Sequence, residues 1–205
     1  MGPVGTRELI RLIIAGILGY LLGSLNSSLI VGSFYGVDVR KHGSGNAGAT
    51  NTLRTLGKKA AVMAAAGDVL KGIIACLIGM LLADETGVMV GGIASIAGHN
   101  WPVYFGFKGG KGILTTFAVV LMMEWKIALI LLGIFIIIVA LTRYISLGSI
   151  ICAALLPVFS VIFNKSLEFV LFSAVLALIA IARHHQNISR LLKGTESKFG
   201  VKKSG

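Results

Sequence analysis

Long apolar runs alternate with short polar segments along the whole chain. The longer runs reach or approach the ~20 apolar residues that a membrane-spanning helix needs. The pattern therefore predicts an all-α polytopic membrane protein with seven transmembrane helices. The predicted helices cover residues 9–34, 60–83, 87–99, 113–123, 127–141, 147–163 and 167–182.

The composition agrees with a membrane-embedded chain. Of its 205 residues, 56% are hydrophobic and 13% are charged, and the mean hydropathy is +0.90. Soluble domains carry roughly 25% charged residues. We expect one integral membrane domain over residues 1–205, with a mobile tail over 194–205. Cys76 and Cys152 lie within apolar runs, so neither a disulfide framework nor a metal motif is expected.

Basic residues gather on one side of this topology. A net charge of +11 would suggest nucleic acid in a soluble protein, but here it indicates positive-inside bias and anionic lipids or substrates. Most lysines and arginines fall in segments 35–59, 98–112 and 142–146 and in the tail from Arg183. We therefore place these segments and the C-terminus in the cytoplasm and the N-terminus outside.

Small residues recur at every fourth position in two predicted helices. Such stripes let helix backbones approach closely in lipid. Asn26 lies beside the first stripe and either hydrogen-bonds between helices, which we favour, or lines a cavity. The two stripes are Gly19, Gly23 and Ser27, and Gly87, Gly91 and Ser95.

The segment 98–112 sets Lys108 and Lys111 among several glycines. Glycine allows close approach to a ligand, and successive backbone N–H groups, here those of Gly109 and Gly110, can bind an anion. No serine or threonine follows Lys111, so the Walker A pattern is not matched. The segment predicts a phosphate site. The alternative is a basic cytoplasmic loop without a ligand.

A second polar block, G-S-G-N-A-G-A-T-N-T-L-R, covers residues 43–54. Arg54 can bind a phosphate through two parallel hydrogen bonds. Ser44, Asn46 and Thr50 could instead cap a helix, and capping is compatible with anion binding.

Acidic residues are scarce. Asp68 and Lys71 are three residues apart inside a predicted helix, where a structural ion pair and a direct role with substrate are equally good interpretations. The few carboxylates exclude a two-metal site and a CDP-alcohol type transferase. The remaining class is a site without metal or cofactor for phosphate-bearing substrates at the membrane surface, and a lipid-biosynthetic transfer fits it.

A third block, R-H-H-Q-N-I-S-R-L-L-K-G-T-E, covers residues 183–196. With G-H-N-W-P-V-Y-F-G-F-K-G-G-K-G at 98–112, the three blocks resemble the bacterial PlsY acyltransferases over essentially the whole chain. The resemblance implies transfer of a fatty acyl group from acyl phosphate to the 1-hydroxyl of glycerol 3-phosphate. The product would be lysophosphatidic acid, at the first step of phospholipid synthesis. It also implies a multi-pass protein of the bacterial inner membrane with a cytoplasmic active site.

The resemblance also implies roles for individual residues. Ser44, Arg54 and Lys108 would hold phosphate, with Lys111, Gly109 and Gly110 beside them. The catalytic residues that position glycerol 3-phosphate would be Ser146, His184 and Asn187. From the polar clusters themselves, independently of the resemblance, we expect Asn46, Thr50, Asn51, His99 and Arg143 to support the site.

We expect direct acyl transfer, because acyl phosphate carries a good leaving group and the enzyme need mainly orient two anions. No serine–histidine–acid triad can be composed, since no acid is suitably placed, so a covalent acyl-enzyme is disfavoured. We expect a monomer that contacts membrane lipids and no nucleic acid. The alternative function is a transporter or flippase for a phosphorylated metabolite, which would predict midplane polar groups and repeat symmetry.

Overall fold

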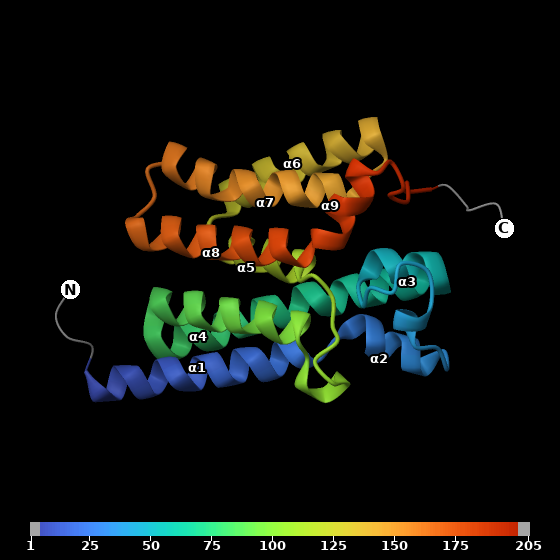
Figure 1. The fold of residues 1–205 in the computed structure, drawn as a ribbon. Coiled ribbons are helices and arrows are strands. Elements are labelled where there is room, and N and C mark those ends of the chain that lie inside the picture. Colours follow the sequence, from blue (N-terminus) through green and yellow to red (C-terminus); the bar gives the residue numbers. More distant parts are fainter. Residues whose placement is uncertain (1–4, 201–205) are drawn as a thin grey trace. The chain divides into compact units, whose positions relative to one another are not determined.

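The computed structural model describes residues 5–200, and every regular element in this part of the chain is helical. The chain forms two compact units, of which the first ends at Met123 and the second begins at Glu124 (Figure 1). The first unit contains α1 (Thr6–Ser24), α2 (Ser27–Phe34), η1 (Val39–Lys41), α3 (Ala49–Leu56), α4 (Lys58–Asn100), η2 (Val103–Phe105) and α5 (Ile113–Met123). The second contains α6 (Trp125–Thr142), α7 (Ile145–Ile162), α8 (Leu167–Arg183) and α9 (His185–Leu192).

The first predicted helix is interrupted where an uninterrupted run was expected. α1 ends at Ser24 and α2 begins at Ser27, because the Asn26 side chain caps the new helix by accepting from the Leu29 N–H at 3.1 Å. Asn26 also donates from Nδ2 to the Ala47 carbonyl at 3.2 Å. Asn26 therefore joins the start of α2 to the non-helical segment at Ala47, whereas the favoured interpretation was a hydrogen bond between helices.

α4 folds back on itself as a helical hairpin. Ala83 and Asp84 have non-helical backbone angles, and Asp84 has a φ of 48°. The predicted break between two helices at this position is therefore confirmed. A Cβ added at Gly79 would collide with the Gly87 carbonyl oxygen, so the two arms approach too closely for any side chain there.

The two stripes of small residues pack against each other. A Cβ at Gly19 would lie 2.5 Å from the Gly91 carbonyl oxygen, and one at Gly23 would collide with the carbonyl of Ser95. α1 therefore lies directly along the second arm of α4 (Figure 1). The stripes predicted close packing but not which helices would pack together. Backbone contact replaces the hydrophobic driving force that helices lack in lipid.

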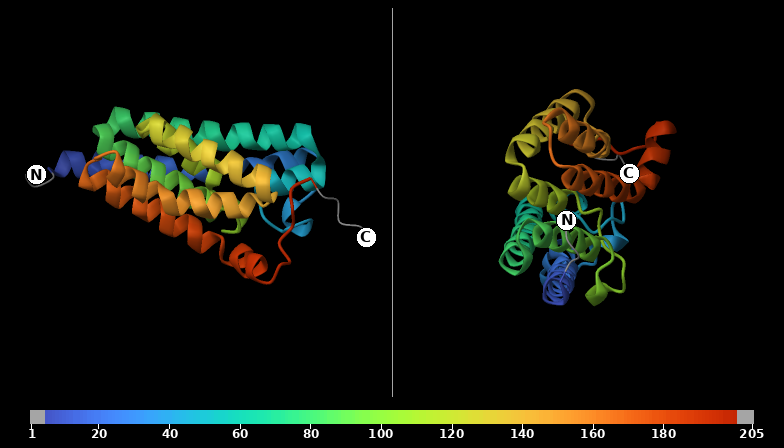
Figure 2. Two further views of the ribbon diagram at one scale, coloured as in Figure 1. Left: turned by 90° about the horizontal axis from the view of Figure 1, so that it is seen from above. Right: turned by 90° about the vertical axis from the view of Figure 1, so that its left-hand side faces the viewer.

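Four helical segments are long and apolar enough to cross a membrane, and a fifth is added if α8 and α9 form one bent span. α8 and α9 meet at an angle of 59°, and His184 lies between them. Figure 2 shows the helices in two further views. α5 is apolar but shorter. The architecture is therefore that of an all-helical membrane protein. The four segments are Thr6–Phe34, Lys58–Phe105, Trp125–Thr142 and Ile145–Ile162.

Candidate functional site

The glycine-rich segment after α4 forms a tight loop that returns to the end of that helix. The Gly110 N–H donates to the His99 carbonyl at 3.1 Å, and the Gly109 N–H donates to the Asn100 carbonyl at 3.3 Å. These two amides were expected to form a nest for an anion, and the structure uses them to close the loop instead. The side chain of Lys108 is exposed on this loop.

Gly110 allows a close approach of three segments. A Cβ at this position would collide with His99 Nε2 and would lie 2.5 Å from the Ala47 carbonyl oxygen. The loop therefore packs directly against the end of α4 and against the polar segment before α3. The two polar blocks of the first unit, far apart in sequence, are neighbours in space.

Asn51 is buried, and its side-chain amide hydrogen-bonds to the backbone of the first polar block and of the segment just before it. Its Oδ1 accepts from the Ser44 N–H at 2.8 Å, and its Nδ2 donates to the carbonyls of Val39 at 2.8 Å and His42 at 3.0 Å. Asn51 thus fixes the loop that presents Ser44, whose side chain is exposed. Its amide is fully engaged with backbone groups, so its supporting role is to shape the loop.

α3 carries Arg54, but it does not begin as the capping alternative proposed. Its N-cap is Gly48, and no side chain caps it, so capping by Ser44, Asn46 or Thr50 is wrong. Gly48 instead adopts an extended conformation that starts the helix (φ −150°, ψ 161°). Arg54 lies exposed in the last turn, where a cation also complements the helix dipole.

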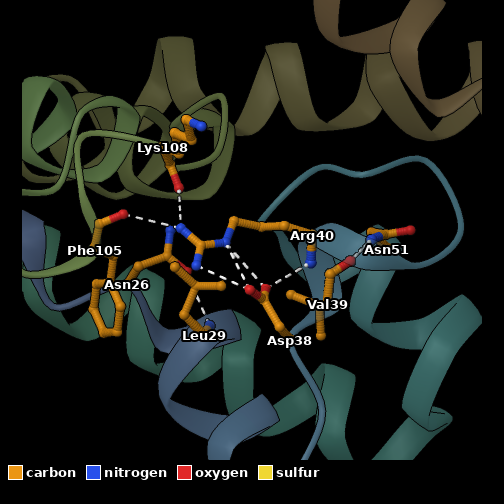
Figure 3. Close-up of polar contacts among 8 residues, drawn as sticks. All are labelled: Asn26, Leu29, Asp38, Val39, Arg40, Asn51, Phe105 and Lys108. Atoms are coloured by element: carbon orange, nitrogen blue, oxygen red, sulfur yellow. Dashed lines mark hydrogen bonds and ion pairs between the residues drawn. The ribbon is translucent and has the colours of Figure 1, made fainter.

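Asp38 and Arg40 connect the two polar blocks, and neither was predicted from the sequence as a site residue. Arg40 donates to both carboxylate oxygens of Asp38 and to the carbonyls of Phe105 and Lys108 (Figure 3). The Asp-x-Arg spacing just before the first block was the available signal. Spacing alone could not show that the arginine reaches a loop more than 60 residues away.

Asp68, Lys71 and His99 form a buried polar hub beneath the loop. Lys71 Nζ lies 2.9 Å from Asp68 Oδ1 and 2.8 Å from His99 Nδ1, and His99 Nδ1 lies 3.3 Å from Asp68 Oδ1. Lys71 also donates to the carbonyls of Gly23 and Leu25 at the end of α1. The hub therefore joins α1 to both arms of α4, and the structural ion pair is present.

Lys71→Met is expected to destabilise the protein by roughly 3–5 kcal/mol, because it leaves the buried Asp68 carboxylate without its cation. Thermal unfolding in detergent measures the effect. Asp68→Asn combined with Lys71→Met should recover much of the loss, since no unpaired carboxylate remains. Unchanged unfolding of Lys71→Met would contradict the assignment of the pair as structural.

In the second unit, the Glu196 carboxylate accepts hydrogen bonds from two of the predicted catalytic residues. Its Oε1 accepts from Ser146 Oγ and from Asn187 Nδ2, each at 2.7 Å, and its Oε2 accepts from Arg190 Nε at 2.7 Å. Ser146 and Asn187 are buried. We call Ser146, Asn187, Arg190 and Glu196 the C-terminal cluster.

Glu196 was missed as a site residue because it lies in the expected mobile tail. The expectation that no acid is suitably placed for a serine–histidine–acid triad did not foresee that Glu196 accepts a hydrogen bond from Ser146. The tail is also tied down where the Phe199 N–H donates to the Arg143 carbonyl at 2.7 Å. The rest of the predicted tail, 201–205, lies outside the described residues.

His184 occupies the bend between α8 and α9 and is buried. Its Nδ1 lies 2.7 Å from the Ala180 carbonyl oxygen, so Nδ1 carries the proton in the neutral ring. Asn187 follows three residues later, within α9. Arg143 is exposed in the turn before α7, where it adopts a left-handed conformation (φ 63°).

Glu196 makes the stability of this cluster depend on pH. Burial would raise the pKa of its carboxyl, but hydrogen bonds from Arg190, Ser146 and Asn187 outweigh burial and lower that pKa below its usual 4.5. A carboxyl whose pKa is lower in the folded protein than in the unfolded chain stabilises the fold at pH values above its unfolded-state pKa. This contribution is lost as the pH falls through the folded-state pKa.

We therefore expect the unfolding temperature to fall as pH drops below about 4.5. The fall should be smaller in Glu196→Gln, which cannot titrate. Glu85→Gln is the matched control, because Glu85 is exposed in the α4 hairpin. Thermal unfolding across this pH range measures the difference, and identical pH profiles for Glu196→Gln and wild type would contradict the assignment.

No three His, Cys, Asp or Glu side chains within residues 5–200 are grouped closely enough to hold a metal ion. Most of the predicted site residues carry cations, hydroxyls or amides. This donor set suits anions such as phosphate.

The helices and their small-residue packing define a polytopic membrane protein with a basic, hydroxyl- and amide-bearing surface in its first unit. Residues 13–194 match the family described as Glycerol-3-phosphate acyltransferase. The chain belongs to this family.

Relatives cover nearly the whole chain. The glycerol-3-phosphate acyltransferase of Thermoanaerobacter sp. (strain X514) is 48% identical over 191 residues, which is 93% of this chain and 96% of that protein. The enzyme of Clostridioides difficile (strain 630) is 43% identical over 203 residues, 96% of this chain and 99% of that protein.

A solved structure is also similar. It is the crystal structure of PlsY (YgiH), an integral membrane glycerol 3-phosphate acyltransferase, in its glycerol 3-phosphate form. The TM-score is 0.85 at 38% identity, covering 94% of this chain and 96% of that chain. Its lysophosphatidic acid form gives a TM-score of 0.84 at 37% identity, covering 92% and 95%.

Proposed function

We propose that the protein transfers a fatty acyl group to glycerol 3-phosphate and releases lysophosphatidic acid. Family membership over residues 13–194 carries this proposal. The similar PlsY structure is described in a glycerol 3-phosphate form and a lysophosphatidic acid form, which are an acceptor and a product of such a reaction. The donor set of the first unit, cations beside hydroxyl groups, suits a phosphate-bearing substrate.

We propose acyl phosphate as the donor and the 1-hydroxyl as the nucleophile. Ser44, Arg54, Lys108 and Lys111 of the first unit would bind substrate phosphate. Arg54 and Lys108 are exposed, so their cations are accessible to a substrate. A guanidinium and an ammonium together can neutralise a phosphate dianion, and their attraction for it grows as charge develops on the leaving phosphate.

In the second unit, Ser146, His184 and Asn187 would orient the glycerol part of the acceptor. The proton on His184 Nδ1 is directed at a backbone carbonyl, which leaves Nε2 as the ring atom with the chemistry of a base. Glu196 already orders Ser146 and Asn187 through hydrogen bonds. These side chains are thus held in fixed positions, which lowers the entropy cost of binding an acceptor.

Direct transfer would proceed in one displacement. The 1-hydroxyl oxygen attacks the acyl carbon, the bond between that carbon and the phosphate oxygen breaks, and inorganic phosphate leaves with the electron pair. The hydroxyl proton passes to His184 or to phosphate. Neutralisation of the leaving phosphate would supply much of the rate enhancement.

The location of this chemistry is also a proposal. We propose seven membrane crossings, counting the arms of the α4 hairpin as two and α5 as a short one. The N-terminus would be outside and the C-terminus in the cytoplasm, because the polar blocks that carry most of the basic residues would then face the cytoplasm. The protein would act as a monomer in the bacterial inner membrane.

The test is an acyl-transfer assay on purified protein with a chelator present. Glycerol 3-phosphate is supplied with palmitoyl phosphate and, in parallel, with palmitoyl-CoA, and lysophosphatidic acid is measured by mass spectrometry. Product from palmitoyl phosphate alone is the expected result. Product from palmitoyl-CoA alone would overturn the donor assignment. No product from either donor, in folded protein, would overturn the proposed function and favour transport of a phosphorylated metabolite.

A further inference from the structure

Arg40 is a basic residue of the first unit, and its contacts join two separate polar segments. Its Nε lies 3.0 Å from Asp38 Oδ1, and its Nη2 lies 3.0 Å from Asp38 Oδ2. Its Nη1 donates to the carbonyls of Phe105 at 2.9 Å and Lys108 at 3.2 Å. All three guanidinium nitrogens are therefore engaged by groups of the protein itself.

The charge of Arg40 is balanced within the fold. The hydrogen bond from Arg40 is the main cause that lowers the pKa of Asp38 below its usual 3.8. Asp38 therefore stays ionised at neutral pH and neutralises the guanidinium. Its carboxylate also accepts from the Arg40 N–H at 3.0 Å, which fixes the short helix η1. An arginine paired in this way is poorly suited to bind a substrate phosphate.

The contacts of Arg40 end on the backbone that carries Lys108. Figure 3 shows the Lys108 side chain extending away from the guanidinium, while its carbonyl oxygen points toward it. On the other side of the pair, the Val39 carbonyl accepts from Asn51 Nδ2 at 2.8 Å, and Asn51 Oδ1 accepts from the Ser44 N–H at 2.8 Å. Hydrogen bonds on either side of the backbone of residues 38–40 thus connect the loop that carries Ser44 (the Ser44 loop) with the loop that carries Lys108 (the Lys108 loop).

We infer that the Asp38–Arg40 pair positions the Lys108 loop relative to the Ser44 loop, so that side chains of both loops can bind the same phosphate. This inference rests on the proposed function, and it assigns Arg40 no contact with substrate. A planar guanidinium suits the task, because its fork can bridge a carboxylate and two carbonyls at once. The single ammonium of a lysine cannot reproduce this geometry.

Arg40→Ala is expected to raise the KM for the phosphate-bearing substrate on the order of tenfold, with a much smaller change in kcat, because a displaced loop weakens binding. Arg40→Lys should recover only part of the loss. Lys41→Ala is the matched control, since Lys41 is an exposed neighbour in η1 and should leave KM near the wild-type value. Steady-state assays in which each substrate is varied in turn measure these constants.

A double-mutant cycle separates positioning from general loss of structure. If Arg40 acts through Lys108, then Arg40→Ala should have little further effect on kcat/KM in a Lys108→Ala background, whereas independent effects would add. Additive effects, or an unchanged KM in Arg40→Ala, would overturn the inference.

If Arg40→Ala does not fold, Asp38→Asn is measured instead, and a KM equal to that of wild type would overturn the inference. Inactive wild-type protein would instead count against the proposed function, so failure of the one is distinguishable from failure of the other.

Discussion

Replacing Lys108 with alanine is expected to lower kcat/KM for acyl transfer by on the order of 10²-fold or more, because an ammonium that stabilises charge on a phosphate in the transition state is lost. Lys108 is exposed while its backbone is fixed by Arg40, so the substitution should remove a charge without unfolding the loop. Arg54→Ala should have an effect of similar size for the same reason. Initial rates with both substrates varied measure these losses.

The control for Lys108→Ala is Lys126→Ala. Lys126 is also an exposed lysine, but it lies at the start of α6 beside the Trp125 ring, 5.7 Å from its centroid. Its removal changes the net charge by the same amount and should leave kcat/KM close to wild type. Near-normal rates in both Lys108→Ala and Arg54→Ala would contradict the proposed phosphate site.

Gly110→Ala is expected to lower kcat/KM on the order of 10²-fold, because a displacement of about 1 Å in a substrate-binding loop can cost that much. The new Cβ would collide with His99 Nε2 and would lie 2.5 Å from the Ala47 carbonyl oxygen. The Lys108 loop must therefore move away from the Ser44 loop.

Gly133→Ala is the matched control, since a Cβ there meets nothing within 4 Å and the position lies in α6. That variant should fold and react like wild type. Wild-type kinetics in Gly110→Ala would show that the close approach of the two loops is not needed for catalysis.

Much of the fold follows from the sequence because hydrophobic runs and small-residue spacing are local signals. The stripe of Gly19 and Gly23 identified the face that packs on Gly91 and Ser95, since only small residues allow such contact. The interruption at Asn26 could not be predicted from hydropathy, because it depends on a side chain capping the following helix. The turn at Asp84 was predicted because charges there end an apolar run.

The candidate site was predicted less completely, because contacts between distant segments leave no periodic signal. Lys108 and Ser44 were singled out from their glycine-rich blocks, but the link through Arg40 depends on a fold that joins residues 40 and 108. Glu196 was missed for a similar reason, since its place in the expected mobile tail predicted a solvated carboxylate without partners in the fold. The sequence indicated that the N–H groups of Gly109 and Gly110 could bind an anion. In the fold they donate to the carbonyls of Asn100 and His99 instead.

We expect the protein to recognise glycerol 3-phosphate through its phosphate, by cations and hydroxyls rather than through a metal. The measurement is calorimetric titration of the purified protein in the presence of a chelator, with glycerol 3-phosphate and glycerol compared as ligands. Glycerol 3-phosphate should bind and glycerol should not. Equal binding of the two ligands, or binding of glycerol 3-phosphate only after a divalent cation is added, would contradict this expectation.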